Sequence, residues 1–87
     1  MTKTEKAKQS FKNQLESFYN LKADGYGNYK LMDDVREKEY RIKIGKINYR
    51  FEACLGKQAG WVRLFSGKFN DEISKPLAHY LNICSSK

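Results

Sequence analysis

The segment that decides the fold is residues 40–54, which read Tyr40-Arg41-Ile42-Lys43-Ile44-Gly45-Lys46-Ile47-Asn48-Tyr49-Arg50-Phe51-Glu52-Ala53-Cys54. In its first part apolar residues alternate with cations. A strand here would point Tyr40, Ile42 and Ile44 to one side and Arg41 and Lys43 to the other. This alternation is typical of a strand with one buried face.

The second part of the segment repeats the pattern after a break at Gly45. From residue 49 to residue 55, apolar side chains again alternate with polar ones. Two alternating segments joined by a short connection that contains glycine predict a β-hairpin, here over residues 39–45 and 47–55. One face of this hairpin is apolar and the other is basic.

The basic face of the hairpin carries Arg41, Lys43 and Arg50. The whole chain has 17 Lys and Arg against 10 Asp and Glu, a net charge of +7. This charge favours a polyanionic partner such as nucleic acid, although many small basic domains use such charge only for solubility. We expect the basic face to carry the function.

The chain before the hairpin predicts a helix and a connection. Thr2 and Glu5 have the spacing of a capping box, and apolar residues recur at steps of three and four over residues 4–20. Turn-forming residues at 24–28 end this helix. Residues 29–39 are interpreted as a connection, either a short helical turn or an irregular strand at the sheet edge, and several acidic residues gather there.

The chain after the hairpin predicts a strand and a second helix. Residues 61–66 are apolar on both faces, which predicts a third strand in a central or covered position. Residues 70–72 are interpreted as a loop or cap, and Pro76 stands in the first turn of a helix over 75–84. The predicted fold is a single α+β domain, 1–87, in which a helix, a three-stranded antiparallel sheet and a helix follow one another. The expected core consists of Phe11, Leu15, Phe18, Ile42, Ile44, Tyr49, Phe51, Val62, Leu64, Leu77 and Leu81.

Several kinds of site are not supported by the composition. Cys54 and Cys84 lack the spacing of a metal or redox motif, and a disulfide between them is left open. With His79 as the single histidine, neither a triad nor an ordinary zinc site can be assembled, so no metal or cofactor is predicted. No stretch is long and apolar enough to span a membrane, and a cytoplasmic protein is expected.

The cations of the hairpin suit two kinds of phosphate chemistry. Paired side chains on one face of a sheet lie about 5 Å apart, so they can converge on one phosphate or on two neighbouring ones. They can hold an RNA backbone passively. They can also stabilise the dianionic phosphorane that forms when an RNA 2′-hydroxyl attacks the adjacent phosphate, a reaction that needs no metal.

Tyr40 to Ile44, followed by Tyr49-Arg50-Phe51, resembles the central hairpin of the RelE/ParE superfamily of small bacterial toxins. Residues 62–68 and the closing helix occupy the places of that family's last core strand, its turn of glycine and a basic residue, and its C-terminal helix. The resemblance covers about residues 10–83. It implies an endoribonuclease that cuts messenger RNA in the ribosomal decoding site and is held inactive by an antitoxin.

The resemblance also implies roles for single residues. Arg41 and Lys43 match the two basic residues of the first hairpin strand, Arg50 matches the arginine that contacts the scissile phosphate, and Lys68 matches a basic residue after the third strand. Tyr80, on the last helix, is the nearest substitute for a tyrosine of the family. The expected catalytic residues are therefore Arg41, Lys43, Arg50, Lys68 and Tyr80. Three further cations are expected to contact nucleic acid: Lys46, Lys57 and Arg63.

Two alternatives from other functional classes stay open. A helix, three strands and a helix is also the element order of the double-stranded-RNA-binding domain, which binds without catalysis. A small inhibitor, for example phage-encoded, could instead dock its basic face or its sheet edge on a host nucleoprotein. The expected partners are accordingly RNA or the ribosome, with an antitoxin or another protein as a further partner.

Overall fold

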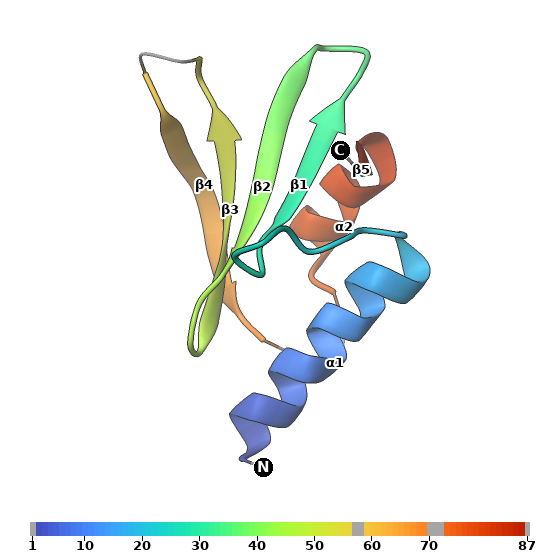
Figure 1. Cartoon of the computed structure of the whole chain (residues 1–87), viewed down its shortest axis with the longest axis vertical. Helices are drawn as coiled ribbons and strands as arrows, with labels where there is room; N and C mark the ends of the chain where they lie inside the picture. Colours follow the sequence, from blue (N-terminus) through green and yellow to red (C-terminus); the bar gives the residue numbers. More distant parts are fainter. Residues whose placement is uncertain (1, 57–58, 70–72, 87) are drawn as a thin grey trace.

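Four strands that follow one another along the chain form the body of an antiparallel sheet, and two helices pack against one of its faces (Figure 1). The structure is a computed structural model that describes residues 2–56, 59–69 and 73–86. The predicted α+β class is confirmed. The elements are, in chain order, α1 (Lys3–Phe18), β1 (Tyr29–Asp33), β2 (Lys38–Ile44), β3 (Asn48–Cys54), β4 (Trp61–Lys68), α2 (Lys75–Ile83) and β5 (Ser85–Ser86).

The sheet contains more strands than the three predicted. Its order is β4-β3-β2-β1-β5, and β5 is two residues long. The segment 29–39, expected to be a connection, forms β1 and the turn into β2. In β1, Tyr29, Leu31 and Asp33 are buried. Asp33 takes an inward position although it is polar, so the pattern of apolar residues alone does not show this strand. Its carboxylate is satisfied there because it accepts hydrogen bonds from backbone N–H groups of the following turn.

The strand β4 lies at an edge of the sheet, so the prediction of a central or covered strand is wrong. Phe65 pairs with Phe51 and Arg63 pairs with Glu52, which leaves Leu64 as the additional residue of a β-bulge. Leu64 is 45% exposed and Val62, two residues before it, is 40% exposed, although both were expected in the core.

Both helices cover the same face of the sheet, as predicted. From α1, the ring of Phe11 stacks on that of Tyr49 with 4.7 Å between centroids. From α2, the ring of Tyr80 lies 4.6 Å from that of Phe51. We call this covered side the core face. The opposite side of the sheet is the outer face.

Phe18, at the end of α1, was expected in the core but is 74% exposed. The chain reverses directly after the helix, where Asn20 adopts a positive φ of 56°. This reversal lets the backbone N–H of Leu21 donate to the carbonyl of Leu15 at 3.1 Å. Leu21, only 3% exposed, joins the core in this region while Phe18 remains outside it.

The two cysteines do not pair. Cys54 and Cys84 are both free thiols. No helix within the described ranges combines the length and apolar character that crossing a membrane requires.

Most of the expected core is confirmed. Expected core residues that are buried are Phe11, Leu15, Ile42, Tyr49, Phe51, Leu77 and Leu81, and Ile44 packs against them while partly exposed.

Candidate nucleic-acid interface

The register of the sheet brings cations of neighbouring strands together on the outer face. Lys43 of β2 stands directly opposite Arg50 of β3, and Arg50 stands opposite Ser66 of β4. Like charges directly opposite each other destabilise a sheet. A bound anion between these two side chains would offset that cost. By the same register, Lys30, Arg41, Glu52 and Arg63 also lie on the outer face.

A hollow of about 440 Å³ lies between the ends of these strands and the β2–β3 turn. Four predicted site residues line it, and all four are exposed: Lys43, Lys46, Arg50 and Arg63. Within the part of the chain that the structure describes, no ion pair involves any of them. Asn48 and Ser66 add neutral polar groups to the lining. We call this cavity the outer-face hollow, and its positive charge is available to an anion from solution.

Arg41 lies on the outer face as predicted, but its guanidinium is already engaged. Its Nε donates to the carboxylate of Glu52 at 2.5 Å, and its Cζ lies 4.3 Å from the centroid of the Trp61 ring. Glu52 is only 8% exposed. A buried carboxylate needs such a partner, because an unpaired charge is costly to remove from water. Arg41 therefore joins three strands together and is less available to a phosphate than Lys43 or Arg50.

Lys68 does not line the outer-face hollow, although it stands opposite Asn48, which does. It is the last residue of β4, and it lines a second hollow of about 320 Å³ between the β2–β3 turn and the start of α1. Among the described residues that line it, Lys3 is the other cation. We call this cavity the end hollow. Lys57, another expected RNA contact, lies outside the described residues, as does the predicted loop or cap at 70–72.

Tyr80 is on the opposite side of the sheet from Lys43 and Arg50. Its ring packs among the core-face aromatics, 5.3 Å from the Tyr40 ring and 6.0 Å from the Phe65 ring. The sheet stands between this hydroxyl and the outer face, so Tyr80 cannot act on a phosphate held by Lys43 and Arg50. Its position in the apolar stripe of α2 is the signal in the sequence that indicates packing rather than catalysis.

The strongly shifted pKa values also belong to groups away from the outer face. Burial, together with the neighbouring charge of Glu16, raises the pKa of Tyr29 to about 12. Burial raises the pKa of the Cys84 thiol to about 11, with Asp33 adding to the shift. The described residues also contain no cluster of three or more His, Cys, Asp and Glu side chains that could hold a metal ion.

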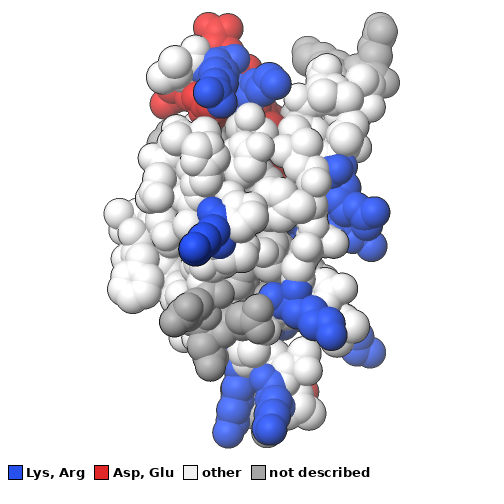
Figure 2. Space-filling view, turned by 180° about the vertical axis from the view of Figure 1, so that it is seen from behind, with Lys and Arg blue, Asp and Glu red and all other residues white. Residues whose placement is uncertain are grey.

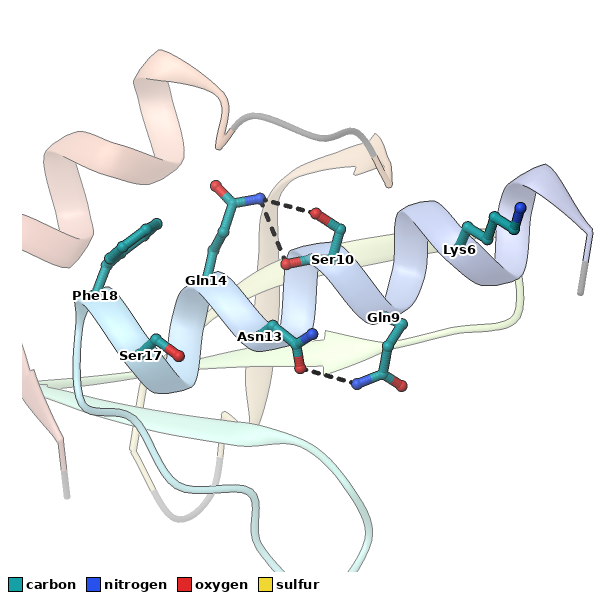
Figure 3. Close-up of a pocket in the computed structure, with 7 residues that line it drawn as sticks. All are labelled: Lys6, Gln9, Ser10, Asn13, Gln14, Ser17 and Phe18. Carbon is teal, nitrogen blue, oxygen red and sulfur yellow. Dashed lines mark hydrogen bonds between the residues drawn. The ribbon is translucent and has the colours of Figure 1, made fainter.

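A different hollow, of about 380 Å³, follows the exposed side of α1 (Figure 3). Its polar side chains are largely bonded to their own helix. Gln9 donates to Asn13 at 2.9 Å, and Gln14 donates to the hydroxyl and carbonyl oxygens of Ser10. Among the described residues that line it, Lys6 is the one cation. This surface is therefore less suited to a polyanion than the outer-face hollow.

Acidic side chains gather at one end of the molecule. Figure 2 shows most of the visible Asp and Glu atoms at the upper end, next to Lys and Arg, with other Lys and Arg side chains further down and along one edge. Figure 1 places the β1–β2 turn at this upper end. There Asp33 lies 4.0 Å from Arg36. The acidic character predicted for residues 33–39 is thus kept away from the β2–β3 turn.

Two exposed cations, one on the outer face and one in the end hollow, were not among the predicted site residues. Lys30 of β1 stands opposite Arg41, and the alternation of Tyr29, Lys30 and Leu31 was the signal that could have revealed it. Lys3 lines the same hollow as Lys68 although 64 residues lie between them in the sequence, so only the tertiary structure brings them together.

Comparisons of the chain with protein-family models, with curated proteins and with solved structures found no match.

Proposed function

We propose that the protein binds RNA through its outer face, with phosphates held between Lys43 and Arg50. The observation that carries this proposal is the direct pairing of these two cations on an uncovered sheet face. Arg63 lines the same hollow from the next strand. An arginine can bond a phosphate with two parallel N–H donors, and a lysine adds a compact charge beside it.

The arrangement favours binding over cleavage. The family resemblance implies a metal-independent ribonuclease, and Lys43 and Arg50 could stabilise the charge of its transition state. A proton carrier is also needed for that reaction. Of the expected catalytic residues, Tyr80 lies behind the sheet and Arg41 is held by Glu52. Cleavage of messenger RNA at the ribosome, and control by an antitoxin, therefore stay predictions.

The first prediction tests the paired cations. Lys43→Gln combined with Arg50→Gln should weaken binding of an oligouridylate of about 4 nucleotides, a short single-strand site, by roughly tenfold or more, because charge-assisted hydrogen bonds are lost. The slope of log K against log salt should become shallower by about 1.4, since each phosphate contact on a single strand contributes about 0.7. Fluorescence anisotropy over a salt series measures both quantities.

The matched control removes the same charge elsewhere. Lys22 and Lys75 are exposed and line neither hollow. Lys22→Gln combined with Lys75→Gln should change the affinity less than twofold. Equal weakening by both double variants would show that only net charge matters, and a wild-type affinity independent of salt would indicate a protein partner. Electrophoresis of the RNA after the same incubation shows whether it was cut.

A further inference from the structure

The outer-face hollow and the end hollow meet at the β2–β3 turn. Ile47 lines both hollows and is 59% exposed, although it is a large aliphatic residue. Lys46 precedes it and lines the outer-face hollow. The turn therefore presents an apolar side chain next to a cation, with a cationic hollow on each side of it.

The turn is held in a tight conformation. The backbone N–H of Gly45 donates to the carbonyl of Asn48 at 2.9 Å. A Cβ atom at position 45 would lie 2.7 Å from that same oxygen, so the close approach requires glycine. Because the backbone closes in this way, the positions of Lys46 and Ile47 relative to the strands are fixed.

The end hollow continues the positive surface beyond the turn. Lys3 and Lys68 line it together with Thr4 and Ala7 of α1, and the buried Phe69 lies at its apolar side. Neither lysine forms an ion pair with a residue in the ranges 2–56, 59–69 and 73–86. In Figure 1 the β2–β3 turn reaches the lower end of the sheet, on the side of the N-terminal half of α1.

We infer that the RNA bound by this protein is single-stranded and crosses the β2–β3 turn, with phosphates in both hollows and Ile47 against a base or ribose between them. This inference rests on the proposed function of the outer face. The two hollows lie on either side of the turn residue Ile47: one is lined by outer-face cations, and the other runs from Lys68, opposite Asn48 on β3, to Lys3, Thr4 and Ala7 of α1. Nucleic-acid duplexes are stiff, whereas a single strand can bend over a turn of this size.

The second prediction uses the length of the RNA. Lys3→Gln combined with Lys68→Gln should weaken binding of an oligouridylate of about 16 nucleotides by roughly tenfold, because two phosphate contacts are lost. The same variant should bind an oligomer of about 4 nucleotides within twofold of the wild type, because so short a strand fills only the outer-face hollow. Fluorescence anisotropy on both oligomers makes the comparison.

Two further measurements separate the path from simple charge attraction. A fully paired RNA hairpin of similar length should bind more weakly than the 16-nucleotide strand and should not respond to Lys3→Gln with Lys68→Gln. The control Lys22→Gln with Lys75→Gln should leave both strands unaffected within twofold. Thermal melts confirm that every variant is folded.

The outcomes distinguish this inference from the proposed function. Weakening confined to the long strand supports the path over the turn. If Lys3→Gln with Lys68→Gln weakens neither strand, or weakens both equally, the path over the turn is overturned. The outer face remains a binding site in that case if Lys43→Gln with Arg50→Gln still weakens binding of the short strand. Preferred binding of the paired hairpin also overturns it. A wild-type protein that binds neither strand refutes the proposed function itself.

Discussion

Glu52 is a carboxylate among the cations of the outer face. It stands opposite Arg41 on one side and Arg63 on the other, and it is nearly buried. Its ion pair with Arg41 stabilises the sheet, but its negative charge repels any phosphate held nearby. Stability and RNA binding should therefore respond in opposite directions when this charge is removed.

The third prediction is that Glu52→Gln lowers the free energy of unfolding by about 1–3 kcal/mol, because the partly buried Arg41 loses a charged acceptor. The melting temperature should fall by about 4–8 °C for each kcal/mol. Affinity for the short oligouridylate should rise about threefold, since Arg41 becomes available and a repulsive charge is gone. Chemical denaturation and anisotropy measure the two effects.

Glu37 provides the control for this variant. It is exposed in the β1–β2 turn, at the other end of the sheet from the outer-face hollow. Glu37→Gln changes the net charge equally and should alter neither stability nor affinity appreciably. Weaker RNA binding in Glu52→Gln would contradict a phosphate site beside this carboxylate.

At the scale of the elements, β3 and β4 approach closely where Gly67 stands opposite Tyr49. A Cβ atom at position 67 would lie 2.9 Å from the Tyr49 hydroxyl oxygen and 3.1 Å from two ring carbons. The tyrosine has little room to withdraw, because its ring stacks on Phe11 and its hydroxyl lies 2.9 Å from the Ser74 hydroxyl. The absent side chain of Gly67 thus makes space for a core aromatic.

The fourth prediction is that Gly67→Ala destabilises the protein by about 1–3 kcal/mol, the usual cost of overpacking a core. Gly25 is the matched control, since a Cβ atom there would meet no other atom within 4 Å. Gly25→Ala should leave the melting temperature almost unchanged. Differential scanning fluorimetry compares the two, and an equal loss in both variants would refute the steric explanation.

The elements were predictable to different degrees. The hairpin β2–β3 was predicted closely, because strict alternation along 40–54 is a local signal that needs no partner. The start of α1 was equally clear, and the Thr2 hydroxyl indeed accepts a hydrogen bond from the Glu5 backbone N–H. β1 was missed because a buried Asp33 takes an inward position. β4 was misplaced because its apolar residues on both faces are typical of a covered strand, whereas its exposed Leu64 belongs to a bulge.

At the scale of the whole molecule, the burial of weak acids makes the free energy of unfolding depend on pH in the alkaline range. The Tyr29 hydroxyl of β1 donates to Glu16 of α1 at 3.2 Å and so joins the helix to the sheet. Its pKa, about 12, lies above the ordinary value of 10 because burial and then the charge of Glu16 oppose ionisation. Such a group contributes stability that is complete below pH 10 and is lost as the pH rises through 12.

The fifth prediction follows from that window. The free energy of unfolding of the wild type should fall between about pH 10 and 12, and Tyr29→Phe should reduce this fall because the residue no longer ionises. Part of the fall should remain, since burial also raises the pKa of Cys84, to about 11, and that of Tyr40. Urea denaturation at a series of pH values measures the difference, and identical profiles would contradict a role for the Tyr29 hydroxyl.

The sequence by itself determined the α+β class, the central hairpin and the shared face of Lys43 and Arg50, because these depend on the two-residue period of single strands. Only the tertiary structure decided what each cation can do. Arg41 is engaged by Glu52 and Trp61 through strand register, and Lys68 and Lys3 line one hollow because α1 packs against the sheet. Register, bulges and helix packing depend on contacts between distant segments, which no local pattern contains.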